Sequence, residues 1–217
     1  MSLFIAVPVK DLANAKQRLV PVLEPSERRQ LARAMLEDVL HALGSAGVGS
    51  VHVVSADIEV MDLARQRGAQ CLVERVNRGH TEAVAFAQQE ARMAGAERFL
   101  TVPGDVPCVT AGEVALMLDA LGSGALFVPS LSGFGTNGAL LAPPDSMPLK
   151  FGEPSFDNHL EAARQRGLAP VVLNLSGLGL DIDAPEDLTL LLERGPDTRS
   201  AALLREWGLP ARLAGSS

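Results

Sequence analysis

The chain has 217 residues, of which 47% are hydrophobic and 21% are charged, and its formal net charge at pH 7 is −7. This length is enough for a sizeable hydrophobic core, and no linker or composition shift divides it, so we expect one domain over residues 1–217. The negative charge argues against a general electrostatic grip on nucleic acid or anionic membranes, so an anionic ligand has to be met locally.

The cysteines and the N-terminus favour a cytoplasmic protein. Cys71 and Cys108, the only cysteines, form neither the ligand set of a zinc site nor a closely spaced redox pair. The apolar run in MSLFIAVPVK is too short for a signal peptide, and its lysine lies on the wrong side. The uncharged stretch 120–144 is interrupted by glycines and prolines, so it is no membrane helix. We expect neither a membrane nor a nucleic acid as a partner.

In the first part of the chain, short β-rich runs alternate with amphipathic segments. The sequence predicts strands at 3–9, 51–56, 69–73, 98–103 and 125–130, and helices at 26–43, 57–67, 81–94 and 110–121. This alternation is typical of βαβ units on a mainly parallel sheet. The last of these helices begins with a capping box, in which Thr110 is the N-cap and Glu113 follows three residues later.

After Gly133 the alternation becomes less regular. The segment GALLAPP and a loop precede a predicted helix at 155–166, a strand at 170–175 and a short helix after Pro185. We expect the C-terminal tail, 190–217, to be helical, with one short helix at 198–207. The elements together predict an α/β fold, with a single mainly parallel sheet flanked by helices. Ligands of such sheets bind beyond the carboxyl ends of the strands, so the residues after each strand are the candidate site.

Three cations follow the first strand. Lys10, Lys16 and Arg18 lie in VPVKDLANAKQRL, and no dinucleotide-binding G-x-G-x-x-G follows that strand. Cations beside helix-terminal amides neutralise oligophosphates, which predicts a phosphate-binding corner. On composition alone, a solvated helix start with lysines on its outer face is an equal alternative.

One charge, Asp105, stands in TVPGDVPCV at the end of the strand 98–103. An aspartate in this place is often a turn former or a helix N-cap. The next helix already has its own cap at Thr110, which leaves Asp105 free to face a ligand at the sheet edge.

Two more carboxylates lie in LDIDAPEDL. In an extended segment Asp181 and Asp183 point to the same side, while Ile182 points into the core. Asp183 alone could cap the helix that begins near Pro185, but a cap does not account for two aspartates on one face. Close carboxylates need a cation, and oxygen-rich sites that face phosphates are the usual home of magnesium. With Asp105, the pair would form a set for one or two ions.

A glycine-rich loop and the helix after it offer neutral hydrogen bonds. Glycines let backbone amides approach a ligand, and these segments contain Gly133, Gly135, Gly138 and Gly152 together with Thr136 and Asn137. Ser155 is a candidate N-cap of the helix that carries His159, which would place an anion at the positive end of that helix. For His159 itself, a satisfied structural histidine is the main alternative.

The chain contains no nucleophile elbow, P-loop or Cys/His zinc pattern, so its residues favour nucleotidyl transfer. Over about residues 1–190 it resembles the CofC family of guanylyltransferases, through PVKxxxxAKxRL (8–19), PGDVP (103–107), GTN (135–137), FGxxSFxxH (151–159) and DIDAPEDL (181–188). The resemblance implies a nucleotidyltransferase domain with a nucleotide-diphospho-sugar transferase-like fold. It also implies Mg²⁺-dependent transfer of GMP from GTP to a small phosphorylated acid, with release of pyrophosphate, in biosynthesis of the deazaflavin coenzyme F-420. The family's acceptors are 2-phospho-L-lactate, phosphoenolpyruvate and 3-phospho-D-glycerate.

By position, the resemblance assigns roles to individual residues. It makes magnesium ligands of Asp105, Asp181 and Asp183, contacts to the acceptor's phosphate of Thr136, Gly152 and Ser155, and the basic, catalytic signature for the triphosphate of Lys10, Lys16 and Arg18. Two segments depart from the family pattern. GHTEAV (79–84) has Thr81 where an asparagine is common, and PSLSGFG (129–135) replaces a P-D-R turn. Both segments lie where the nucleotide or the acceptor is expected to bind.

The implied reaction needs no protein general base, because the ionised phosphate of the acceptor attacks the α-phosphorus of GTP in line. Positioning and charge neutralisation would then be the work of the protein. Two rival functions stay open: another nucleotidyl- or glycosyltransferase of the same fold, and a non-catalytic nucleotide-binding relative. The expected partners are GTP and the phospho-acid, and the sequence leaves a homodimer open.

Overall fold

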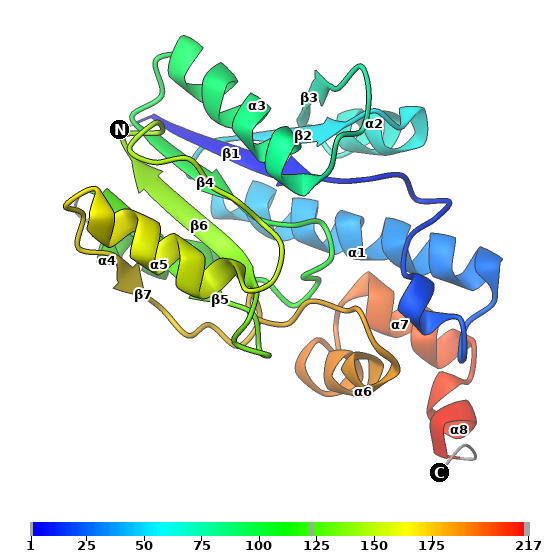
Figure 1. Ribbon diagram of the computed structural model, residues 1–217. Coiled ribbons are helices and arrows are strands. Elements are labelled where there is room, and N and C mark those ends of the chain that lie inside the picture. The colour runs from blue at the N-terminus through cyan, green and yellow to red at the C-terminus, as the bar shows by residue number, and fades with distance from the viewer. Residues whose placement is uncertain (1, 122–123, 215–217) are drawn as a thin grey trace.

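One sheet runs through the chain, with helices on both of its faces (Figure 1). The computed structural model describes residues 2–121 and 124–214, and within them seven strands pair in the order β3-β2-β1-β4-β6-β5-β7. The strands are β1 (Leu3–Pro8), β2 (Ser50–Ser55), β3 (Gln70–Val73), β4 (Arg98–Thr101), β5 (Gly124–Pro129), β6 (Thr136–Ala142) and β7 (Val171–Val172). Only β6 runs antiparallel to its neighbours among these strands. The mainly parallel α/β sheet is therefore confirmed.

Two hydrophobic cores cover the two faces of the sheet. The helices are α1 (Pro25–Ala46), α2 (Ile58–Gln66), α3 (His80–Met93), α4 (Ala111–Ala120), α5 (Ser155–Gln165), α6 (Pro185–Arg194), α7 (Arg199–Glu206) and α8 (Leu209–Ala214), with a 3-10 turn η1 (Gln17–Leu19). α3 and α5 pack on one face, and α1, α2, α4, α6 and α7 pack in the other core. Along β1, Phe4 and Ala6 lie in the core that contains α3 and α5, whereas Ile5 and Val7 lie in the core on the other face. β1 is buried on both faces, as expected of a central parallel strand.

No helix in the described parts of the chain combines the length and the apolar character needed to cross a lipid bilayer.

The expected glycine-rich loop is partly a strand. Residues 136–138 belong to β6, where the sequence predicts a loop, and β6 pairs with both β4 and β5. Gly138 suits this place because a Cβ atom there would lie 2.8 Å from a methyl group of Leu178. The prediction was wrong because the antiparallel pairing depends on β4, which is distant in sequence. As a result, Thr136 and Asn137 lie on a strand that pairs with two others.

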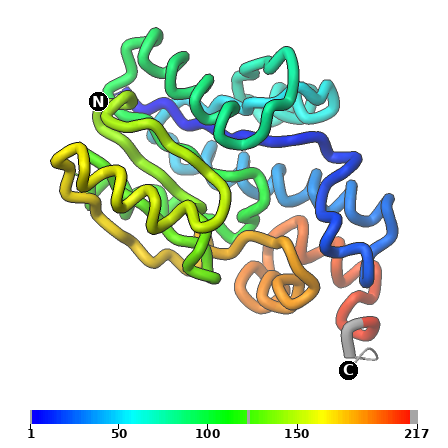
Figure 2. The backbone as a smooth tube through the Cα atoms, viewed as in Figure 1, coloured from blue at the N-terminus to red at the C-terminus, as the bar shows by residue number. Residues whose placement is uncertain are grey.

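The C-terminal tail folds back onto α1 (Figure 2). The carboxylate of Asp38 on α1 accepts hydrogen bonds from the backbone N–H groups of Arg199 (2.8 Å) and Ser200 (2.9 Å) at the start of α7. Helix α7 matches the predicted helix 198–207, and α8 lies in the tail that was predicted to be helical, although no separate helix was predicted there. Helix α7 also packs against α6, which follows the segment 181–183 in the chain.

Candidate active site

Several of the predicted site residues come together at the carboxyl edge of the sheet. Asp105 follows β4, the cationic segment follows β1, and β6 begins at this edge with Thr136 because it runs antiparallel. The backbone N–H of Ile182 donates to the carbonyl oxygen of Asp105 at 3.1 Å. Ile182 is fully buried, as predicted, so its two aspartate neighbours are directed toward the site.

Lys16 connects two of the three aspartates. Its Nζ atom lies 2.7 Å from Oδ2 of Asp105 and 2.9 Å from Oδ1 of Asp183, and its side chain is only 7% exposed. Burial disfavours the ammonium charge, but attraction to Asp105 and Asp183 outweighs it and raises the pKa of Lys16. The same attraction outweighs the burial of Asp105 and lowers the pKa of its carboxyl group. Lys16 is therefore a charged residue of the site.

The backbone of Lys16 is unusual. Its φ angle is +57°, and within the described residues it is the only residue other than glycine with a positive φ. A left-handed backbone costs a residue with a side chain about 1–2 kcal/mol. The conformation lies at the entrance of η1 and places the ammonium between the carboxylates. Strain of this kind gathers at functional sites, where surrounding contacts hold it in place.

The third aspartate, Asp181, sits beside this ion pair. Its Oδ1 atom accepts a hydrogen bond from Nδ2 of Asn137 at 3.0 Å. Burial raises the pKa of Asp181, and the negative charges of Asp105 and Asp183 add to that rise, although the Asn137 hydrogen bond opposes it. The three carboxylates therefore interact electrostatically, which the sequence alone only suggested.

The environment of one carboxylate oxygen of Asp105 indicates whether a metal ion would fit at this site. In the part of the chain that the structure describes, Oδ1 of Asp105 is buried and has no hydrogen-bond partner. Leaving a buried acceptor without a partner is unfavourable, so this atom is suited to a ligand or cation. With all three aspartates ionised and Lys16 protonated, the group has a net charge of −2. Carboxylate oxygens in such a group are suitable ligands for Mg²⁺.

The fit is incomplete without a substrate. No group of three acidic or histidine side chains within residues 2–121 and 124–214 is close enough to hold a metal ion by itself. Lys16 takes Oδ2 of Asp105 and Oδ1 of Asp183, so an ion has to use the remaining carboxylate oxygens together with oxygens of the substrate. Magnesium and its three ligands therefore stay a prediction.

The other two predicted cations lie farther out. Lys10 and Arg18 are both exposed. Burial lowers the pKa of His80 to about 4, the charge of Asp105 opposes this, and the charge of Lys10 adds to it, so Lys10 acts on the same region. Among the three, Lys16 is the one that the structure joins to the carboxylates.

Thr136, Ser155 and His159 form a second polar group. The Thr136 Oγ1 atom lies 2.9 Å from Nδ1 of His159 and 3.4 Å from the Ser155 hydroxyl group. Ser155 is therefore not an N-cap as predicted, because Pro154 holds that position and the Ser155 hydroxyl group turns to Thr136. Asp183 does not cap α6 either, because the N-cap of that helix is Ala184. The carboxylate of Asp187 accepts hydrogen bonds from the backbone N–H groups of Asp183 and Ala184.

Thr81 holds the segment that carries Gly152. Its Oγ1 atom accepts from the N–H of Phe151 at 2.9 Å and donates to the carbonyl oxygen of Phe151 at 3.3 Å. One hydroxyl group therefore satisfies both backbone groups of the residue before Gly152. Gly152 has a φ of +113°, which a residue with a side chain rarely adopts. Thr81, where the family commonly has an asparagine, therefore ties α3 to the predicted acceptor site.

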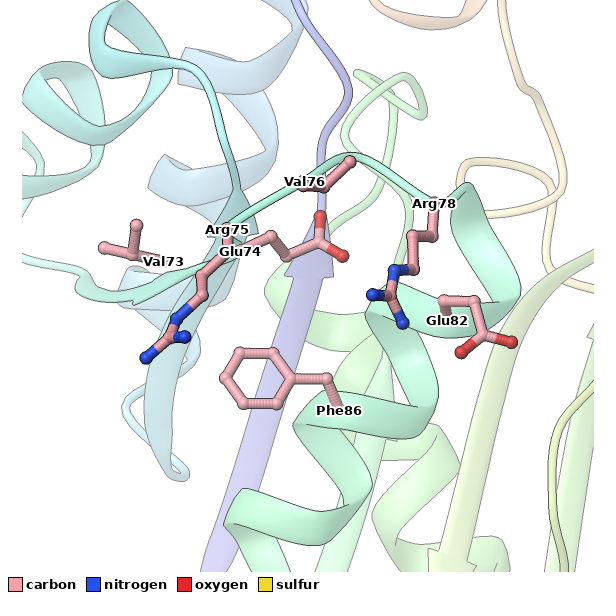
Figure 3. Close-up of a pocket in the computed structure, with 7 residues that line it drawn as sticks. All are labelled: Val73, Glu74, Arg75, Val76, Arg78, Glu82 and Phe86. Carbon is pink, nitrogen blue, oxygen red and sulfur yellow. The ribbon is translucent and has the colours of Figure 1, made fainter.

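A cavity of about 310 Å³ opens along the segment that joins β3 to α3 (Figure 3). It is lined by Val73, Glu74, Arg75, Val76, Arg78, Glu82 and Phe86. A smaller hollow shares Glu74 and is also lined by Lys10 and His80, so the cavity leads toward the cationic corner. Burial raises the pKa of Glu74. The sequence reasoning missed these residues, although their place after a strand was a signal for them.

The buried His159 predicts an acid-sensitive fold. Burial lowers its pKa from 6.5 to about 4, and the charge of His80 contributes. The unfolded chain therefore takes up the proton first, so His159 contributes stability above pH 6.5 that is lost as the pH falls toward 4. We expect urea denaturation to show His159→Phe as less stable than the wild type at pH 7, with the gap narrowing by roughly 3 kcal/mol near pH 4. A gap that stays constant would contradict the shifted titration.

The chain is similar to known proteins over nearly its whole length. A family model described as "Guanylyl transferase CofC like" matches residues 3–217. A phosphoenolpyruvate guanylyltransferase of Rubrobacter xylanophilus is 40% identical over 197 residues, which cover 90% of this chain and 96% of that protein. A 2-phospho-L-lactate guanylyltransferase of Methanothermobacter thermautotrophicus is 35% identical, covering 92% of this chain and 88% of that protein.

Solved structures confirm the expected fold. A protein of Desulfovibrio desulfuricans named as a nucleotide-diphospho-sugar transferase superposes with a TM-score of 0.80 at 20% identity, covering 98% of each chain. A nucleotidyl transferase of Methanothermobacter superposes with a TM-score of 0.64 at 16% identity, covering 94% of this chain and 99% of that one. At such identities the likeness concerns the fold alone.

Proposed function

Since this chain belongs to the family of CofC-like guanylyl transferases, we propose that it joins GMP from GTP to a small phosphorylated acid and releases pyrophosphate. The names of the relatives favour phosphoenolpyruvate or 2-phospho-L-lactate as the acceptor, and 3-phospho-D-glycerate is a third candidate of the same chemistry. The observation that carries the proposal is the group formed by Lys16 with Asp105 and Asp183, beside a buried carboxylate oxygen that has no hydrogen-bond partner among the described residues.

The chemistry follows from the charges of the reactants. An ionised phosphate oxygen of the acceptor attacks the α-phosphorus of GTP, an O–P bond forms, and the bond to the β-phosphate breaks. The leaving pyrophosphate takes the electron pair of that bond, and the acceptor loses no proton, so no general base is required. Orientation of the two reactants can supply about 7–11 kcal/mol of the barrier.

The side chains of the site supply charge neutralisation and alignment. The ammonium of Lys16, held by carboxylates, opposes the negative charge that builds up during the transfer. A magnesium ion, when bound by Asp105, Asp181 and Asp183, would screen the phosphates and orient them. The exposed Lys10 and Arg18 are available to the outer phosphates of GTP.

We place the nucleoside of GTP in the cavity at β3 and α3. Its volume, about 310 Å³, lies in the range of small-molecule sites. The adjoining hollow with Lys10 leads from this cavity toward Asp105, in the order nucleoside, phosphates and carboxylates. The acceptor then occupies the opposite side, at Thr136, Gly152 and Ser155. We further propose that the protein is a cytoplasmic enzyme of coenzyme F-420 biosynthesis. Whether it forms a homodimer is a question for a measurement of its oligomeric state.

The test is a matrix of substrates. The protein is incubated with each nucleoside triphosphate and each phospho-acid, with magnesium or with excess chelator, and pyrophosphate and product mass are measured. We expect pyrophosphate release only with GTP, a phospho-acid and magnesium together, and a product that contains both GMP and the acid. Turnover that survives chelation would contradict the metal assignment.

The same matrix separates the rival functions. Release of a nucleoside diphosphate, with a sugar nucleotide as donor, would indicate a glycosyltransferase of this fold. If GTP binds with magnesium but is not consumed in the presence of any of the acceptors, the protein would be a non-catalytic relative. Either result would overturn the proposed reaction.

A further inference from the structure

Beyond the proposed reaction, the surroundings of His159 determine where its proton lies. The ring is buried, at 2% exposure, and its Nε2 atom lies 3.0 Å from the backbone nitrogen of Lys150. A backbone N–H can only donate, so Nε2 has to accept. In the neutral ring the proton is then on Nδ1, which donates to Thr136.

This tautomer decides how the Thr136 hydroxyl group is used. Its oxygen accepts from Nδ1 of His159 and from the Ser155 hydroxyl group, at 2.9 Å and 3.4 Å. Among the described residues, both hydrogen bonds of this oxygen are therefore accepted ones, which leaves the hydroxyl proton for another partner. A hydroxyl group in this state can serve a further ligand only as a donor, and phosphate oxygens are acceptors.

Packing holds the imidazole ring of His159 in the orientation in which it donates a hydrogen bond to Thr136. The imidazole is stacked on Phe127 at a centroid distance of 5.3 Å and meets the edge of Phe151 at 5.1 Å. Phe151 is held in turn by the Thr81 hydroxyl group, and Lys150 by the His159 ring. One histidine therefore orients the Thr136 hydroxyl group and anchors the segment that leads to Gly152.

We propose that His159 is a positioning residue, which fixes the Thr136 hydroxyl group as a hydrogen-bond donor to the phosphate group of the acceptor. His159 does not touch the reacting atoms in this assignment and acts only through Thr136. The inference rests on the proposed function for one point, that a phosphorylated acid binds beside Thr136.

Three variants test the proposal on the full chain. His159→Phe keeps a flat ring between the two phenylalanines and removes both hydrogen bonds, whereas His159→Asn keeps a donor that can reach Thr136. Thr136→Val keeps the shape of the side chain and removes the hydroxyl group. We expect His159→Phe to raise the KM for phosphoenolpyruvate, or for whichever phospho-acid turns over, about 10-fold or more. The KM for GTP should change less than about 3-fold, and His159→Asn should recover most of the loss.

A double variant separates positioning from general stability. If His159 acts through Thr136, adding His159→Phe to Thr136→Val should raise the acceptor KM by less than about 2-fold. If His159→Phe raises the acceptor KM equally in the wild-type and Thr136→Val backgrounds, the proposal is overturned. Equal increases in the KM for the acceptor and the KM for GTP would also overturn it. Urea denaturation of each variant at pH 7 identifies those that remain folded under assay conditions.

A spectroscopic measurement on the free protein needs no turnover. Nitrogen-15 NMR of the His159 ring should show the proton on Nδ1, and a proton on Nε2 would overturn the proposal by itself. If none of the phospho-acids supports turnover by the wild-type protein, the proposed function is overturned instead. The role of Thr136 as a hydrogen-bond donor to the acceptor's phosphate is overturned with it. The two failures are therefore distinguishable.

Discussion

Replacing Asp105 with asparagine should lower the rate of pyrophosphate release by about 10²–10³-fold while the protein stays folded. The substitution keeps the size of the side chain but removes the charge that holds Lys16 at 2.7 Å and the free carboxylate oxygen suited to a cation. Lys16 keeps Asp183 as a partner at 2.9 Å, so its ammonium is not left buried and unpaired.

The measurement is pyrophosphate release at saturating GTP and acceptor, over a range of magnesium concentrations. Asp119→Asn is a matched control, because Asp119 is an exposed aspartate in the last turn of α4 and is not part of the proposed site. The control should keep the wild-type rate within about 2-fold. If Asp105→Asn retains more than a tenth of the rate, Asp105 is not a magnesium ligand of the proposed kind.

The parts of the site that follow from local rules could be predicted from the sequence. Strand alternation placed Ile182 in the core and Asp181 and Asp183 toward the site, and Ile182 is fully buried. The capping box at Thr110 is also local, and both of its hydrogen bonds are present. Because that helix has its own cap, Asp105 was available for the site, as its contact with Lys16 shows.

The parts that depend on distant contacts could not be predicted in the same way. Lys16 lies 89 residues before Asp105 and 167 before Asp183, and its left-handed backbone has no signature in its neighbours. Local propensity made Ser155 an N-cap, but its hydroxyl group turns to Thr136 on a strand whose pairing is not local. Propensity describes what a segment does alone, whereas these residues are placed by the sheet.

The resemblance to a family gave residue roles but no hydrogen-bond directions. Thr81 appeared as a departure from the family pattern, and only the structure shows that it satisfies both backbone groups of Phe151. The cavity at Glu74 was missed for a different reason, because no motif marks it and its residues are spread over a strand end, a loop and α3. Both features concern the walls of the site, and neither is marked by a charged motif.

Replacing Lys16 with methionine should lower both activity and stability, because it leaves Asp105 and Asp183 without the cation between them. We expect a loss of about 2–3 kcal/mol in the free energy of unfolding, less than for a fully buried pair, since the carboxylates are 33% and 45% exposed and solvent screens them. Lys10→Met, which removes an exposed cation, should change the free energy of unfolding by less than about 0.5 kcal/mol.

The double variant Lys16→Met with Asp105→Asn shows whether repulsion is the cause. Removing one carboxylate charge relieves the repulsion, so the double variant should be more stable than Lys16→Met alone in urea denaturation at pH 7. Activity should not return with stability, because the ammonium that neutralises the phosphates is missing in both variants. If the double variant is instead less stable by the sum of the two single losses, the residues are not coupled. Stability recovered without activity would separate the role of Lys16 in folding from its role in phosphoryl chemistry.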